Sequence, residues 1–176
     1  MKDLHNYIFE KLNVRNIKDY VYFPKTKKEL IQILKERLSE NESANLNDID
    51  VSEIKDMDHL FYELDPHDID ISGWDVSNVT NMNCMFIYCE NFTSDLSKWN
   101  VSKVKDMYKM FAGCTNFNSD LSKWDVSNVK DMYNMFAYCK KFNSDLNNWN
   151  VSNINDMNRI FYRCNSLKNK PSWYKE

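Results

Sequence analysis

The stretch that decides the fold is Trp124–Asn148, WDVSNVKDMYNMFAYCKKFNSDLNN, a 25-residue unit that the chain repeats. Near-identical units begin at Trp74, Trp99 and Trp149. A more diverged unit, IDVSEIKDMDHLFYELDPHDIDISG, begins at Ile49. One such unit cannot bury its own apolar face, so the exact repetition predicts a stack of identical supersecondary units. We expect a helical cap over 1–48, five repeats over 49–73, 74–98, 99–123, 124–148 and 149–173, and a tail over 174–176.

Apolar residues recur at the same place in every unit, which predicts one continuous core. Hydrophobic residues make up 43% of the chain and aromatic residues 14%, enough for such a core. The recurrent Phe positions are Phe61, Phe86, Phe111, Phe136 and Phe161; those of Met are Met57, Met82, Met107, Met132 and Met157; those of Val are Val51, Val76, Val101, Val126 and Val151. A Met and aromatic stripe at a fixed repeat spacing is typical of packing rather than of a cofactor site.

Two local patterns lie within each unit. The alternation of Trp124 and Val126 predicts a short strand. The apolar residues of 131–139 fall at i, i+3, i+4 and i+7, which predicts one to two helical turns with Asp131 as the N-cap.

The N-terminal 48 residues have a different pattern, typical of a cap. Residues 4–12 show helical spacing, residues 20–23 are aromatic and β-branched and predict an extended segment, and Pro24 ends that segment. Thr26 and Glu29 have the spacing of a capping box, which predicts a second helix. Its expected inward residues are Leu30, Ile31, Leu34 and Leu38.

These residues resemble a leucine-rich repeat, because 96–101, LSKWNV, fits LxxLxL with Trp in place of the second Leu. More closely, WDVSNVxxMxxMFxxCxxFNxDLSxW resembles the 25-residue repeat of BspA-family surface proteins and mycoplasma lipoprotein-associated repeats, over about residues 20–173. The segment FPKTKKEL at 23–30 is similar to the lead-in of such arrays. The resemblance implies an α/β repeat, a short right-handed leucine-rich-repeat-like solenoid with a helical N-terminal cap. It also implies binding or adhesion, and it supplies no catalytic residues.

Four cysteines share one column, and their spacing argues against disulfides. The column holds Cys89, Cys114, Cys139 and Cys164. In a stack they would lie about 4.8 Å apart, which is long for the ~3.8 Å Cβ separation of a disulfide. We expect free, buried thiols in a reducing compartment, with Cys84 on the outward side of a helical turn.

Other sequence features bear on location. No run of about 18 apolar residues is present, so no membrane span is expected. Residues 1–14 lack the apolar stretch of a signal peptide, and no early Cys suggests lipid attachment. We therefore expect a cytoplasmic protein, with the cell surface as the alternative if an export signal lies outside this chain.

An acidic column is the strongest candidate for metal chemistry, and it consists of Asp70, Asp95, Asp120 and Asp145. One interpretation is a calcium ladder; the other is that each carboxylate accepts backbone N–H bonds at a turn. Calcium loops of that type are Gly-rich and this chain has two Gly, so we expect no metal and no cofactor. No phosphate-binding loop, GxGxxG, GxSxG or HExxH motif is present, so we expect no enzyme activity.

Two outward faces remain as candidate protein-binding sites. The strand face holds Lys98, Asn100, Lys123, Asp125, Asn148 and Asn150, and the turn face holds Tyr88, Tyr108, Tyr133 and Tyr138. Tyr is common at interfaces, although rings on neighbouring repeats can also simply cover one another.

We expect a non-catalytic protein-binding solenoid of bacterial type, an intracellular inhibitor or adaptor that a mobile element could encode. The alternatives are a surface adhesion module and a nucleic-acid-associated protein. The last would use residues 98–176, which hold thirteen Lys or Arg against seven acids. The net charge of −3 gives a dedicated nucleic-acid binder no support. The protein partner and the oligomeric state are left open.

Overall fold

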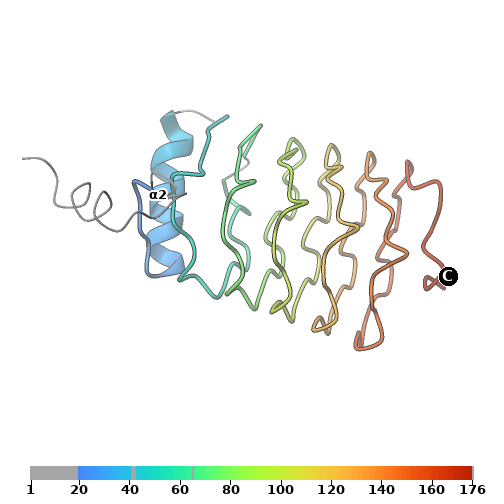
Figure 1. The fold of residues 1–176 in the computed structure, drawn as a ribbon. Coiled ribbons are helices and arrows are strands. Elements are labelled where there is room, and N and C mark those ends of the chain that lie inside the picture. The colour runs from blue at the N-terminus through green and yellow to red at the C-terminus, as the bar shows by residue number, and fades with distance from the viewer. Residues whose placement is uncertain (1–19, 41–42, 65, 176) are drawn as a thin grey trace, which may run out of the picture.

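The computed structural model describes residues 20–40, 43–64 and 66–175 as a mostly irregular repeat fold. Figure 1 shows successive repeats lying side by side along one axis, from the helix α2 to the C-terminus. Within the described ranges α2 (Lys27–Glu40) is the one helix, and the sheet is limited to isolated parallel bridges. These bridges are Tyr22↔Ile49, Asn45↔Asp70, Asp56↔Asn81, Asn81↔Asp106, Asp106↔Asp131 and Asp131↔Asp156.

The helix α2 begins where the capping box predicts and lies across the N-terminal end of the repeats (Figure 1). The backbone N–H of Glu29 donates to Oγ1 of Thr26 at 3.2 Å, and the Glu29 carboxylate accepts the N–H of Lys25 at 2.7 Å. Leu30, Leu34 and Leu38 are buried against the core, and Ile31 is half-buried. The helix predicted over residues 4–12 lies outside the described residues.

Ion pairs also hold α2 to the repeats. Lys27 pairs with Asp56 at 3.4 Å and with Asp58, and Arg37 pairs with Asp48 at 2.7 Å. No helix in the described part of the chain has the length and apolar character needed to cross a membrane.

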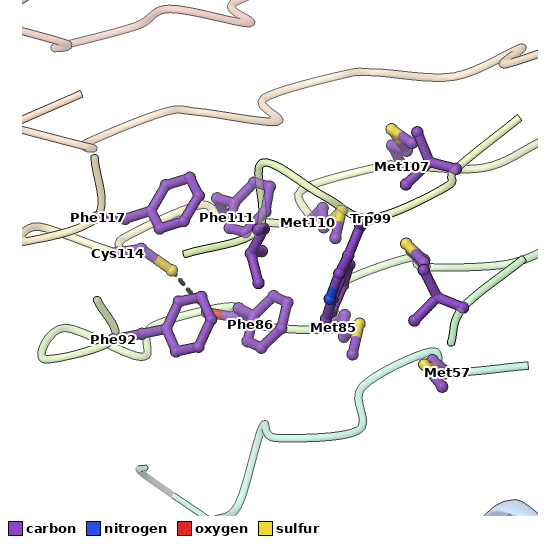
Figure 2. Packing of buried hydrophobic residues seen from close by; sticks show 14 of the residues in the cluster. Met57, Met85, Phe86, Phe92, Trp99, Met107, Met110, Phe111, Cys114 and Phe117 are labelled. Atoms are coloured by element: carbon purple, nitrogen blue, oxygen red, sulfur yellow. Dashed lines mark hydrogen bonds between the residues drawn. The ribbon is translucent and has the colours of Figure 1, made fainter. Parts of the chain in front are cut away.

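A ladder of stacked aromatic rings forms the core, as the Phe column predicts. From Phe61 to Phe161 the ring centroids of successive members lie 5.2, 5.4, 5.6 and 5.9 Å apart, with interplanar angles of 11° or less. A second row, Phe92, Phe117 and Phe142, packs against the first; Phe86 and Phe92 lie 4.1 Å apart (Figure 2). Stacked aromatic pairs contribute about 0.5–1.5 kcal/mol beyond the area they bury.

The helical turns predicted over 131–139 and its equivalents are wrong; a chain of tight turns takes their place. In residues 107–113, the N–H groups of Met107, Lys109, Phe111 and Gly113 donate to the next repeat, at 2.8–3.0 Å. The residues between them, such as Met110 and Ala112, close turns within their own repeat. Lys109 and Gly113 have positive φ angles, 51° and 82°, which turn the chain out of a helical path. Within residues 107–113 the N–H groups that bond outside their own repeat therefore all donate to the following repeat.

The strand predicted at Trp124–Val126 is also absent, because its backbone groups close turns within the repeat. The N–H of Trp124 donates to the carbonyl of Leu121 at 3.1 Å, and the carbonyl of Val126 accepts the N–H of Val129 at 3.0 Å. Side chains make the bonds to the neighbouring repeat instead. Nε1 of Trp124 donates to the carbonyl of Leu96 at 3.0 Å, and the N–H of Leu96 donates to Oγ of Ser119 at 2.8 Å. The same Trp bond recurs for Trp74, Trp99, Trp149 and Trp173, and the same Ser bond for Ser94 and Ser144. Adjacent repeats are thus joined here by side-chain to backbone hydrogen bonds.

Candidate binding faces

All six residues predicted for the strand face are exposed, but three of them stabilise turns of the backbone. The side-chain oxygens of Asn100, Asp125 and Asn150 accept the backbone N–H groups two residues later, at 3.0–3.2 Å. Such bonds build turns and are typical of Asn and Asp. Lys98, Lys123 and Asn148 are the members for which no such turn bond exists among the described residues.

The four predicted tyrosines divide into two groups. Tyr108 and Tyr133 are half-buried and stack on each other, with ring centroids 5.5 Å apart and planes at 13°. The Lys109 ammonium lies 4.9 Å from the Tyr108 centroid, and Tyr108 packs on a small cluster that includes Cys84. This pair is surface packing between neighbouring repeats.

Tyr88 and Tyr138 are exposed, by 65% and 43%, and two further tyrosines join them. Tyr62 is 52% exposed and Tyr162 is 41% exposed. We name these four residues the tyrosine ridge. The sequence concealed Tyr62 and Tyr162 because the equivalent positions between them hold Ile87, Ala112 and Ala137, so the column does not read as aromatic.

Contacts hold the ridge in place on the surface. Tyr62 and Tyr88 line a shared pocket of about 300 Å³, and the Tyr138 and Tyr162 centroids lie 5.4 Å apart at 84°. Between these pairs the Tyr88 ring lies over Gly113, where a Cβ atom would come within 2.7 Å of the ring. Gly113 therefore leaves the space that the Tyr88 ring occupies.

Arginine side chains make the C-terminal end of the ridge cationic. The Arg163 guanidinium lies 5.7 Å from the Tyr138 centroid and 5.6 Å from that of Tyr162, and Arg159 lies 5.8 Å from the latter. A hydrogen bond from Arg163 lowers the pKa of Tyr162. Cations over aromatic faces in this way are attracted by the ring quadrupole.

The acidic column accepts backbone N–H bonds, as the second interpretation predicts. Asp70, Asp95, Asp120 and Asp145 each accept the N–H two residues later, at 2.9–3.0 Å. For Asp95 the N–H of Ser97 is the main cause of a lowered pKa. In the described ranges, no group of three or more His, Cys, Asp or Glu residues is placed to hold a metal ion.

The cysteine column consists of free thiols bonded to the core backbone. Sγ of Cys114 donates to the carbonyl of Phe86 at 2.9 Å (Figure 2), and Cys139 does the same to Phe111 at 3.0 Å. Cys84 lies outside the main core, as its predicted outward position implies, but it is not exposed. It is 4% exposed because Ile87 and Ala112 pack around it, and this burial raises its pKa to about 11.

We expect Cys84 and Cys164 to react with iodoacetamide well before Cys114 and Cys139. Cys164 is half-buried and its pKa is raised to about 12, whereas Cys114 and Cys139 are fully buried with pKa values held well above the usual range. A cysteine reacts only as the thiolate, and only where the reagent can reach its sulfur. Timed labelling of the native chain with mass spectrometry measures the order. Early labelling of Cys114, or a disulfide between neighbouring column members, would contradict it.

Comparison with known proteins places the repeats in one family. A family described as Mycoplasma protein of unknown function, DUF285, matches residues 28–128 and 102–175, so the matched region begins inside α2 and includes every repeat. No curated protein and no solved structure matches the chain.

Proposed function

Since this chain belongs to the DUF285 family, described as Mycoplasma protein of unknown function, its function must be inferred from its own surfaces, and we propose that it is a non-catalytic protein-binding repeat protein. It would act as an inhibitor or adaptor inside the cell. The free thiols in the core support a reducing compartment.

We further propose that the stack is a short, right-handed solenoid of the BspA-type leucine-rich repeat. Parallel bridges between positions 25 residues apart support stacked, equivalent repeats. Right-handed connections are the strong rule for parallel units. Leu96, Trp99 and Val101 are all buried, as the corresponding positions of an LxxLxL segment require.

The tyrosine ridge is the observation that carries the binding proposal. Four exposed tyrosines on adjacent columns give a large amphipathic surface, and Tyr is enriched among residues that dominate binding energy. Tyr88 and Tyr138 have positive φ angles of 61° and 64°, and neighbouring rings or Gly113 fix their positions. Rings held in place before binding lose less conformational freedom on binding, which favours affinity.

The interior polar groups support a role without catalysis. Buried Ser94, Ser119 and Ser144 accept backbone N–H bonds, and the acidic column does the same at the surface. These hydroxyl and carboxylate groups are used to join or turn the chain. Binding is then the activity that the exposed surface supports best.

The test is affinity capture from a lysate of the source organism, followed by titration of the captured protein against variants. Tyr88→Gly/Tyr138→Gly places at both sites the residue that Gly113 already provides at the equivalent position, so the positive φ angles stay compatible. We expect affinity to fall by about 30-fold or more, since two lost anchors of this kind cost about 2 kcal/mol or more.

The matched control is Lys98→Asn/Lys123→Asn, which copies Asn148 on the strand face. It should change the salt dependence of association more than the equilibrium affinity. If the Lys variant loses affinity while the Tyr variant does not, the strand face is the binding site. Unchanged binding by both, with loss on removal of residues 1–19, would make the repeats a scaffold and contradict the ridge.

A further inference from the structure

At the C-terminal end of the stack lies a row of backbone donors that have no acceptor among the described residues. In the fourth repeat the N–H groups of Met132, Asn134, Phe136 and Tyr138 donate to carbonyls of the fifth, at 2.7–3.0 Å. The equivalent donors of the last repeat are Met157, Arg159, Phe161 and Arg163. Within the described residues these four N–H groups make no hydrogen bond. The stack therefore ends on a face that is shaped to receive one more segment of chain.

The residues after the row cover the core and leave the row open. Trp173 stacks on Trp149 with ring centroids 6.5 Å apart, and the Tyr174 ring packs on Phe161 at 5.3 Å. The last aromatic ring of the core is thus covered. Beside it a pocket of about 600 Å³ is lined by all four members of the row and by Tyr162 and Tyr174, among others.

The pocket is strongly cationic. Arg159, Arg163, Lys170 and Lys175 line it, and none of the described lining residues is acidic. Neither arginine forms an ion pair with a described carboxylate. Both have positive φ angles, 56° and 58°, and both guanidiniums lie over the Tyr162 ring. A row of backbone N–H groups adds further positive potential to such a concavity.

We propose that this end binds an acidic segment of a partner protein as an added rung. Backbone carbonyls of the segment accept from the four N–H groups, as strand addition does at an open sheet edge. Carboxylates of the segment pair with Arg159 and Arg163, whose planar guanidiniums match carboxylate geometry. In the repeats 74–98, 99–123 and 124–148 all four donors of this row are satisfied by one continuous peptide, which favours a peptide over a nucleic acid. The site shares Tyr162 with the ridge but uses neither Tyr88 nor Tyr138, so this proposal stands apart from the proposed function and either can fail alone.

Fluorescence anisotropy with a labelled peptide of alternating Glu and Val tests the ligand class. We expect this peptide to bind the full chain, and the Gln and Val counterpart to bind at least about tenfold more weakly. A labelled oligothymidylate of the same charge should bind less well than the Glu peptide. No binding of the Glu peptide at low salt, or tighter binding of the oligothymidylate, would overturn the proposal.

Substitutions taken from earlier repeats test the site without straining the backbone. Arg159→Asn/Arg163→Gly copies Asn134 and Gly113, both of which have positive φ at the equivalent positions. We expect the Glu peptide to bind about tenfold or more weakly to this variant. Lys98→Asn/Lys123→Asn removes the same charge elsewhere and should leave binding unchanged. Equal loss in both variants would show attraction to net charge alone and refute the site.

Amide hydrogen exchange tests the backbone part separately. In the free chain the Phe161 amide should exchange faster than that of Phe136, whose N–H donates to Ile160 at 2.9 Å. The Glu peptide should slow exchange at Phe161 and leave Phe136 unchanged. Peptide binding without added protection at Phe161 would mean that the segment does not pair with the row, and the added-rung geometry would be wrong.

Discussion

Replacing Phe111 with alanine is expected to lower the free energy of unfolding by about 3–5 kcal/mol, the usual cost of truncating a buried Phe. Its side chain is fully buried between Phe86 and Phe136, at 5.4 and 5.6 Å, and also packs on Phe117 at 4.2 Å. Removing the ring therefore leaves a cavity that neighbours on both sides cannot fill. Urea unfolding followed by circular dichroism measures the change.

Phe23→Ala is the control for that experiment. The Phe23 side chain is 46% exposed, so its truncation should cost less than about 1 kcal/mol. A cost for Phe111→Ala in the same small range would show that the Phe column is not the core. An unchanged slope with denaturant in both variants would show that the change is one of stability rather than of compactness.

A second large effect is expected from Ser119→Ala/Ser144→Ala. The Ser119 and Ser144 hydroxyls are buried and accept the N–H groups of Leu96 and Leu121, at 2.8 and 2.9 Å. Alanine leaves each N–H buried without an acceptor, which costs about 1–3 kcal/mol for each group. We expect the double variant to lose about 2–6 kcal/mol of unfolding free energy, measured in the same urea titration.

Ser77→Ala provides the contrast, because the Ser77 hydroxyl is half-buried at the surface and makes no hydrogen bond with a described residue. Its loss should change stability by less than about 0.5 kcal/mol. A loss below about 1 kcal/mol for the double Ser119 and Ser144 variant would mean that water satisfies the two N–H groups. The buried serines would then not join the repeats.

The features that the sequence predicts well are those fixed by burial or by a local cap. The Phe column predicts the aromatic ladder because a Phe at the same place in every repeat lies next to the equivalent Phe of the neighbouring repeats once the repeats stack. Thr26 and Glu29 predict the start of α2 because both their bonds are made within five residues. The hydrogen bonds of the acidic column are also predictable from the local sequence, because each carboxylate accepts the N–H of a residue two positions later, as Asp95 does from Ser97.

The features that the sequence conceals depend on contacts between repeats. Apolar spacing of i, i+3, i+4 over 131–139 suits a helix and a chain of turns alike; the difference is that alternate N–H groups bond the next repeat. Cys84 is buried by Ile87 and Ala112 in adjacent turns, which no local pattern reveals. The role of Ser119 depends on an N–H that lies 23 residues away. The tyrosine ridge is hidden for a different reason: its members come from two columns, and the other positions of both columns are not aromatic.

The equivalent hydrogen bonds between successive repeats have a consequence for how such a protein evolves. The junctions that join the repeats from 74–98 to 149–173 use the same row of donors and acceptors and the same Phe contacts, so a unit such as 99–123 can follow or precede 124–148 without new partners. Recombination that duplicates or deletes one 25-residue unit would change the length of the ridge and leave α2 and the cationic end as they are. The number of repeats is then the property of the protein that recombination changes most readily. The two ends have no second copy in this sequence, so recombination between repeats does not duplicate them.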